Sequence, residues 1–285
     1  MKLKMVEPWI RTLLFLAAVF SILTVFLIVI FIFKEGLPFL NEIGLFSFTF
    51  GETWLPTRGH FGIFPMLLGS IYLTLGAILI GLPLGVGCAI FFAEFAPAKL
   101  TSWVRPAVEI LAAIPSVIYG FLGLLILVPW LRQLYGGTGF SLLAGALVLG
   151  IMILPTIMTV SEDAIRAVPA SYKEGSLALG ATRWQTVYKV TLPAAQSGIV
   201  ASVVLGMGRA LGETMAVIMI TGNVAQVPTS PLSPLRTLTG NIALEMGYAA
   251  GQHQQALFAT GVILFILIFV LTSLANLVCW KGAKH

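Results

Sequence analysis

Six long apolar stretches limit what this chain can fold into more than any other feature of its sequence. A helix needs about 20 mainly apolar residues to cross the hydrocarbon core of a bilayer. Five of the stretches contain no charged side chain, and one contains a single basic and a single acidic residue. They are Thr12–Phe33, Phe61–Ala93, Ile110–Leu131, Phe140–Val160, Ala194–Gly222 and Ala256–Cys279. We therefore predict an all-α membrane protein with six transmembrane helices.

The composition of the 285 residues speaks against other classes of protein. Hydrophobic residues make up 58% of the chain and charged residues only 9%. A soluble domain carries about 25% charged residues because its surface faces water, so a soluble enzyme is excluded. Strands of a membrane β-barrel would alternate in polarity over segments of about 10 residues, so helices fit better. The first stretch is too long for a signal peptide and no small-residue cleavage site follows it, which predicts a retained helix.

The distribution of lysine and arginine predicts the orientation in the membrane. With the N-terminus in the cytoplasm, 11 of the 16 basic residues fall on the cytoplasmic side, 4 fall outside and Arg209 lies within a span. Because cytoplasmic loops of membrane proteins carry an excess of basic residues, we expect both termini in the cytoplasm. This arrangement also explains the net charge of +5 without a nucleic-acid partner.

The chain lacks the motifs of common catalytic and cofactor sites. Cys88 and Cys279 lie in apolar stretches without metal or redox spacing, so we expect them in the core. The three histidines are scattered, and the acidic pair at 162–163 has no nucleophile or base beside it. No lysine follows a glycine, so a P-loop is absent. If ATP powers this protein, we expect another subunit to bind it together with magnesium.

Two connecting segments are external in this topology, over 34–60 and 223–252. The second opens with Val227–Pro234, whose prolines prevent a continuous helix, and residues 236–250 could then form a short helix at the outer face. Both segments could dock an external partner, or they could be solvated connectors.

The segment 161–193 between the fourth and fifth stretches predicts two short cytoplasmic helices. Pro169 and Ser171 can start the first helix, and Gly180 can end it. A second amphipathic stretch, 182–190, stops before Pro193. Such a helix pair could dock a soluble protein or could simply cover the membrane surface.

This segment resembles the cytoplasmic loop of ABC importer permeases with the pattern E-A-A-x3-G-x9-I-x-L-P. Glu174, Gly180 and Leu192–Pro193 match at the same spacing, whereas the two alanines are Gly175 and Ser176 and the isoleucine is valine. In that family the loop is a coupling helix that sits in a cleft of the ATPase subunit. The resemblance therefore assigns ATPase coupling to Glu174, Gly175, Ser176, Leu177, Ala178, Leu179 and Gly180.

Two further stretches, Glu109–Phe121 and Gly206–Ala216, are similar to the phosphate-specific (Pst) permeases. The run Gly-Glu-Thr-Met-Ala in the second resembles the PstC-type subunit more than the PstA-type subunit. The resemblance implies a type I ABC importer permease fold, with an N-terminal helix and loop over 1–60, a permease domain over 61–280 and a tail over 281–285.

The same resemblance implies a function and a set of partners. It implies import of inorganic phosphate across the inner (plasma) membrane by alternating access. The partners would be two copies of an ATPase subunit, a second homologous permease subunit and an external phosphate-binding protein. Another oxyanion or small solute, a homodimer in place of a heterodimer, and an ion-coupled secondary transporter remain alternatives. Secondary transporters usually show an internal repeat, and we find none here.

Arg209 and Glu213 are opposite charges inside one apolar stretch. An arginine at the bilayer centre costs about 2.5–3.5 kcal/mol on insertion scales, so it should face a pathway or a partner. At positions i and i+4 the two can form a pair, which could be a structural salt bridge. Alternatively, Arg209 meets an oxyanion in the substrate pathway and Glu213 holds it in place. Gly208 and Gly212 would keep that pathway narrow and mobile, or would serve helix packing.

Overall fold

The computed structural model describes residues 3–282, and the side chains of residues 10–97 and 99–274. Within this range, six helical segments are long and apolar enough to cross a membrane, which confirms the predicted number. They run over Ile10–Ile43, Phe64–Phe95, Ser116–Tyr135, Leu142–Arg166, Arg183–Gly212 and Gln252–Leu274. The all-α class is confirmed too, because the described strands are only the two-residue β1 and β2, which pair antiparallel.

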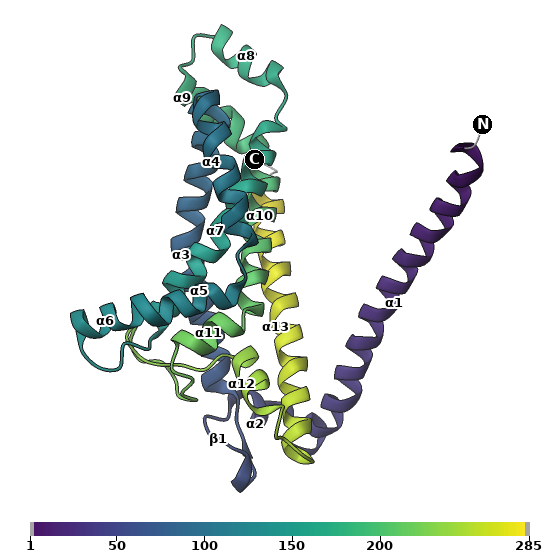
Figure 1. Cartoon of the computed structure of the whole chain (residues 1–285), viewed down its shortest axis with the longest axis vertical. Helices are drawn as coiled ribbons and strands as arrows, with labels where there is room; N and C mark the ends of the chain where they lie inside the picture. Colours follow the sequence, from purple (N-terminus) through teal and green to yellow (C-terminus); the bar gives the residue numbers. More distant parts are fainter. Residues whose placement is uncertain (1–2, 283–285) are drawn as a thin grey trace.

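The elements follow one another along the chain as in Figure 1. Their bounds are α1 (Leu3–Ile43), α2 (Leu45–Phe50), β1 (Trp54–Leu55), η1 (Pro56–Arg58), β2 (His60–Phe61), α3 (Phe64–Ile90), η2 (Phe91–Phe95), α4 (Ala98–Ala113), α5 (Ser116–Leu122), η3 (Gly123–Leu127), α6 (Val128–Tyr135), α7 (Leu142–Arg166), α8 (Ala170–Ala178), α9 (Arg183–Thr186), η4 (Val187–Thr191), α10 (Leu192–Gly212), α11 (Met215–Ile220), α12 (Leu238–Glu245) and α13 (Gln252–Gly282). We call the two ends of the bundle the α8 end and the α12 end.

Close packing of α3, α7 and α10 forms the centre of the bundle. A Cβ added at Gly81 of α3 would lie 2.7 Å from Cγ1 of Ile153, and one added at Gly85 would lie 2.9 Å from Cγ2 of Ile157. On α10, Gly206 approaches the same Ile157. Small residues allow such approach, which matters because packing rather than the hydrophobic effect drives helix association in lipid.

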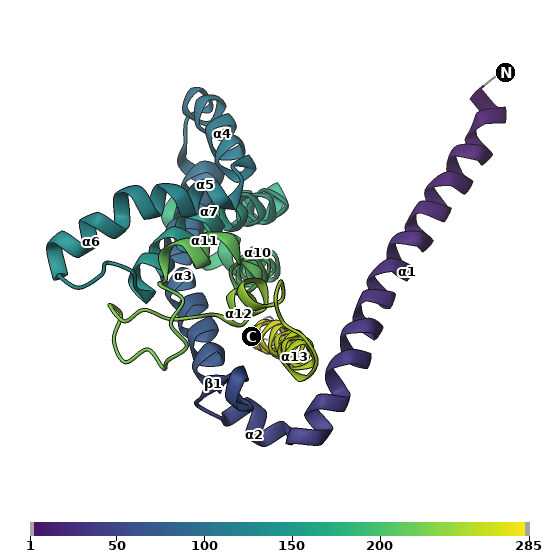
Figure 2. The ribbon, with the colours of Figure 1, turned by 60° about the horizontal axis from the view of Figure 1, so that its bottom comes forward.

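Helix α1 contacts α13 only through its C-terminal part. Phe31 and Phe33 meet Phe258 and Phe265 edge to face, at ring-centroid distances of 5.5 and 5.7 Å. In contrast, the side chains of residues 10–28 are exposed throughout. Figures 1 and 2 show this part of α1 diverging from the bundle.

Helix α1 is also longer than the sequence predicted. We expected a loop over 34–60, but the helix continues to Ile43. The additional turns bury Phe39 and Leu40 in an apolar cluster at the α12 end, which stabilises them as helix. The helix ends at Gly44, whose φ of +90° suits glycine because it has no Cβ.

The third predicted span is interrupted at its first proline. Helix α4 ends at Ala113, Ile114 and Pro115 are non-helical with ψ of 126° and 137°, and α5 begins at Ser116. Proline has no backbone N–H and disfavours the helical conformation of the residue before it. The span therefore starts at Ser116 and ends at Tyr135. None of the described side chains of α4 is buried.

The loop over 223–252 is packed against the bundle. Its short helix α12 agrees with the helix expected there, and Thr237 caps it by accepting a hydrogen bond from Gly240 N at 3.1 Å. The Leu238 N–H donates to Ser70 Oγ of α3 at 2.9 Å. Leu238 itself is fully buried, so this part of the loop is not a solvated connector.

Of the two cysteines, only Cys88 lies among the described side chains. Cys88 is a free, partly buried thiol that packs against the apolar cluster at the α8 end, close to the core position predicted for it. The prediction for Cys279 falls outside the described side chains.

Replacing Gly81 by alanine is expected to destabilise the bundle, because the new methyl group meets Ile153 and the carbonyl oxygen of Gly150. Overpacking of a close-packed core costs about 1–3 kcal/mol. Thermal unfolding of the purified chain in detergent should therefore show a lower Tm for Gly81→Ala. Gly87→Ala is the matched control on the same helix, since nothing lies within 4 Å of that position. Equal Tm values for the two variants would contradict the packing.

Candidate functional site

A loop of two short helices protrudes at the α8 end (Figure 1). Helix α8 begins directly after Pro169, and Gly180 follows its last turn with a φ of +84°. Both boundaries agree with the sequence prediction. Helix α9 begins with a capping box, in which Thr182 Oγ1 accepts from Gln185 N and Gln185 Oε1 accepts from Thr182 N. These two hydrogen bonds stabilise the start of α9 locally.

The predicted coupling segment lies on the outer surface of this protrusion. Among its members only Ser176 is partly buried, with its Oγ 3.0 Å from Thr186 Oγ1. Leu179 is 91% exposed and lies next to the turn at Gly180. The exposed members are Glu174, Gly175, Leu177, Ala178, Leu179 and Gly180. An apolar side chain held this far from the bundle is available to a partner protein, while the contact itself remains a prediction.

Glu94 ties this loop to the end of α3. Its Oε1 lies 2.6 Å from Nζ of Lys173 in α8, and its carbonyl oxygen accepts from Nη2 of Arg183 at 3.3 Å. The neighbouring Phe95 contacts the Trp184 ring at a centroid distance of 6.1 Å. These contacts connect α8 and α9 to η2, which directly follows α3. The sequence analysis did not identify Glu94, because its partners follow 79 and 89 residues later.

The fifth predicted span is not one continuous helix. Helix α10 ends at Gly212, Glu213 is extended with φ −69° and ψ 129°, and α11 begins at Met215. The Glu213 carboxylate accepts from Ala216 N at 3.2 Å, and its carbonyl oxygen accepts from Thr239 Oγ1 at 3.0 Å. These hydrogen bonds replace those of the interrupted helix, so the prediction of a single helix over 194–222 is wrong.

The expected pair between Arg209 and Glu213 does not form, since Glu213 is used to cap α11. Within residues 3–282, the Arg209 side chain makes no hydrogen bond or ion pair. It is partly buried and lies within electrostatic range of Tyr119 in α5. Arg209 thus presents a guanidinium without a counter-charge from any described side chain.

One face of α10 beside Arg209 is open. Ala201, Leu205, Gly208 and Gly212 recur at helical spacing, and nothing lies within 4 Å of a Cβ added at either glycine. Gly206, in contrast, lies on the face packed against α7. Gly206 therefore serves helix packing, whereas Gly208 and Gly212 border a helix face that no other described element covers.

A buried polar network at the α12 end was missed by the sequence analysis. Oε1 of Glu245 accepts from Nη1 of Arg236 at 2.6 Å, and its Oε2 accepts from Nε1 of Trp54 at 2.8 Å. Nε2 of His253 lies 2.8 Å from the same Oε2. The network joins β1, α12 and α13, and no local pattern predicts it because Trp54 and Glu245 are 191 residues apart.

The features above define a multi-pass membrane protein with a protruding two-helix loop at one end. In the described residues, no group of three or more His, Cys, Asp or Glu could hold a metal ion. Residues 81–278 match the family model described as "Binding-protein-dependent transport system inner membrane component". The chain belongs to this family.

Curated relatives indicate which members of this family the chain resembles. The chain is 43% identical over 250 residues to the probable ABC transporter permease protein YqgH of Bacillus subtilis (strain 168), covering 85% of this chain and 81% of that one. It is 38% identical over 259 residues to the phosphate transport system permease protein PstC of Pasteurella multocida (strain Pm70), covering 84% and 81%. The resemblance to the PstC-type permeases is confirmed.

Solved structures confirm the type I ABC importer permease fold. An inward-facing conformation of the MetNI methionine ABC transporter superimposes with a TM-score of 0.58 at 26% identity, covering 82% of this chain and 99% of that chain. A bacterial ABC transporter involved in the import of the acidic polysaccharide alginate gives a TM-score of 0.61 at 18% identity, covering 94% and 96%. The second likeness concerns the fold alone.

Glu245→Ala is expected to destabilise the α12 end, because it leaves Arg236 without its carboxylate and Trp54 without an acceptor. Removing one partner of a buried ion pair costs about 3–5 kcal/mol. The measurement is the unfolding free energy of the purified chain in detergent. Glu52→Ala is the matched control, since this carboxylate is exposed at the same end. Unchanged stability of Glu245→Ala would contradict a structural role for the network.

Proposed function

We propose that this chain is a permease subunit of an ATP-driven importer of inorganic phosphate. The observation that carries the proposal is the 38% identity to a phosphate transport permease over 84% of the chain. An ABC importer alternates between outward- and inward-open states, and this chain supplies part of the pathway and the loop that receives the ATPase movement. Another oxyanion is the alternative that a test has to separate from phosphate.

Arg209 is the residue proposed to meet the substrate. A guanidinium presents a planar fork of donors that suits phosphate, and it stays charged at all physiological pH values. Its lack of an ion-pair partner among the described residues supports this role, since a paired arginine would have to give up its carboxylate first. Gly208 and Gly212 leave room for an anion beside it. Glu213 shapes the helix break and does not hold Arg209.

A second, homologous permease subunit would complete the pathway. The open face of α10 and residues 13–28 of α1 are exposed in the part of the chain that the structure describes, and both suit contact with another helical subunit. A heterodimer follows from the similarity to PstC-type proteins, and a homodimer would use the same surfaces. The α12 end, which we place outside the cell, would receive an external phosphate-binding protein.

The α8 end would lie in the cytoplasm together with both termini, as the basic residues predict. There the segment Glu174–Gly180 would insert into an ATPase subunit, one copy for each permease chain. The chain contains no Gly-Lys sequence, so ATP and magnesium belong to that partner. The contacts of Glu94 with Lys173 and Arg183 would carry the ATPase movement into α3.

Arg209→Ala is expected to abolish transport without preventing assembly. In a strain that lacks this chain, the wild-type gene should restore uptake of labelled phosphate at low external concentration, with labelled sulfate unaffected. The variant should lower that uptake about 100-fold or more, since two charge-assisted hydrogen bonds are lost and each 1.4 kcal/mol is a factor of ten. Arg132→Ala, at an exposed arginine of α6, is the matched control.

The outcomes separate the two parts of this proposal. Normal phosphate uptake with Arg209→Ala would remove Arg209 from the pathway. Intact phosphate uptake in the strain without the chain, or selective loss of sulfate uptake, would overturn phosphate as the substrate. Co-purification of the partner subunits with Arg209→Ala checks that assembly is unchanged.

Leu179→Asp and Gly180→Trp are expected to separate the permease from its ATPase. A carboxylate at the most exposed apolar position, or a bulky residue at a φ of +84°, disturbs the proposed contact surface. Co-purified ATPase should fall at least about tenfold, which corresponds to about 1.4 kcal/mol. Gly247→Trp, at an open position of the α12 end, should retain the ATPase. Full retention and activity with both α8-end variants would count against the coupling role.

A further inference from the structure

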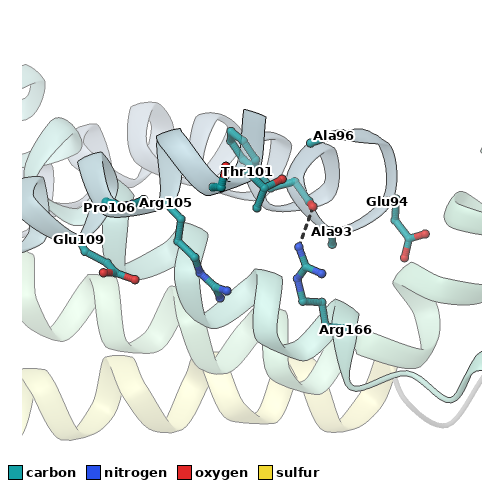
Figure 3. A pocket seen from close by; sticks show the side chains of 10 residues that line it. Ala93, Glu94, Ala96, Thr101, Arg105, Pro106, Glu109 and Arg166 are labelled. Atoms are coloured by element: carbon teal, nitrogen blue, oxygen red, sulfur yellow. Dashed lines mark hydrogen bonds between the residues drawn. The ribbon is translucent and has the colours of Figure 1, made fainter. Parts of the chain in front are cut away.

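A cavity of about 570 Å³ at the α8 end plays no part in the proposed function. It lies between α4 on one side and η2 with the end of α7 on the other (Figure 3). Its polar lining includes Arg105 and Glu109 of α4, Arg166 of α7 and Glu94 of η2. The remaining lining is mostly small or apolar. The cavity is therefore large enough for a ligand group and carries charges of both signs.

Two of these charges are already satisfied by the protein. Arg166 donates from Nε to Glu162 Oε1 at 2.8 Å and from Nη2 to the Phe92 carbonyl oxygen at 2.9 Å. Glu94 is paired with Lys173 at 2.6 Å. Both side chains line the cavity and already have a partner of opposite charge within the protein.

Arg105 and Glu109 are not satisfied in this way. Nη2 of Arg105 has only long contacts, 3.6 Å to Asp163 Oδ1 and 4.0 Å to Glu162 Oε1, and its side chain is 46% exposed. Glu109 forms no hydrogen bond or ion pair with any residue that the structure describes. Figure 3 shows both side chains extending from the same side of α4. The cavity thus offers one cation with only long ion-pair contacts, Arg105, and one anion without a described partner, Glu109, from adjacent turns of α4.

The spacing of Arg105 and Glu109 indicates which charges a ligand of this cavity should carry. Residues i and i+4 of a helix have Cβ atoms about 5–6 Å apart, yet Arg105 and Glu109 do not pair with each other. A simple anion bound at Arg105 would be repelled by Glu109, and a simple cation would be repelled by Arg105. A zwitterion with its anionic and cationic groups a few bonds apart satisfies both.

The opposite face of α4 indicates where such a ligand comes from. Trp103 is 82% exposed and Ile110 is 66% exposed, and both lie on the apolar side of this amphipathic helix, as does the exposed Leu100. Tryptophan is enriched at the boundary between bilayer and water, and amphipathic helices with this pattern lie in that boundary. The cavity therefore opens at the level of the lipid headgroups.

We propose that this cavity binds the headgroup of a phospholipid with a primary amine, of the phosphatidylethanolamine type. The phosphate accepts hydrogen bonds from Arg105, and the ammonium group donates to Glu109. The two groups are joined by a two-carbon linker, which suits side chains one helical turn apart. The headgroup, held by two residues of α4, lies in a cavity that η2 also lines, near the contact of Glu94 with the coupling loop.

The test measures lipid retention by the full-length chain, purified in detergent and analysed by native mass spectrometry. The probes are phosphatidylethanolamine, phosphatidylglycerol and phosphatidylcholine at equal concentration. The wild type should retain phosphatidylethanolamine in preference to the other two. Glu109→Gln and Arg105→Gln should each lower that preference about tenfold, the loss expected for one charge-assisted hydrogen bond. Glu52→Gln and Arg58→Gln, at exposed positions of the α12 end, are the matched controls and should leave it unchanged.

Each other outcome would overturn the proposal. Equal retention of the three lipids by the wild type would mean that the cavity has no headgroup preference. A preference for phosphatidylglycerol that only Arg105→Gln removes would identify an anion site. Displacement of the lipid by millimolar inorganic phosphate would identify a site for free phosphate. The measurement needs no transport, so its failure leaves the proposed substrate untouched.

Discussion

In a lipid bilayer no water is available to the backbone, so every N–H and C=O group of a spanning segment must find a partner within the protein. The spans of this chain do so chiefly as helices. The fifth apolar stretch is the exception, because its helix stops after α10 and resumes as α11, with a non-helical Glu213 between them. The interruption is possible because Glu213 and Thr239 supply the missing hydrogen bonds. Thr239 belongs to α12, and α12 is held in place by Glu245. The irregular backbone in the bundle thus depends on a polar network at its end.

The same interruption determines whether Arg209 has an ion-pair partner. In a continuous helix Glu213 would lie one turn away and could neutralise it. With the Glu213 carboxylate capping α11, the guanidinium has no counter-charge among the side chains that the structure describes. Arginine inside a membrane is costly unless something pairs with it. A substrate anion or a second subunit would supply that pairing, so the proposed pathway follows from the break and not from an ion pair.

Much of the fold follows from local patterns in the sequence. Stretches without charge predict the spans, and Pro169 and Gly180 bound α8. These features act through the backbone of the residues themselves or their immediate neighbours, so one sequence suffices to find them. The break at Glu213 was missed because it depends on Thr239, which comes from another element. Glu94 and Glu245 were missed for the same reason, as their partners are far apart in sequence.

The sequence predicts which residues belong to the candidate site better than it predicts how they are arranged in space. Arg209 was identified because charge is rare in apolar stretches, and the coupling segment because its spacing is that of a known loop. The open face beside Gly208 and the packed face at Gly206 could not be told apart by sequence, since both residues are glycine. Only the position of Ile157 separates them.

The exposed part of α1 has a consequence for biogenesis. The side chains of residues 13–28 are exposed in their own chain, yet lipid tails solvate them as well as protein would, so the single chain is not driven to aggregate within the bilayer. The chain and the proposed second subunit could therefore be inserted separately before they assemble. Recognition of the correct partner subunit then depends on the fit between helix surfaces. Hydrophobicity alone does not favour a neighbouring helix over the surrounding lipid, because both are equally apolar.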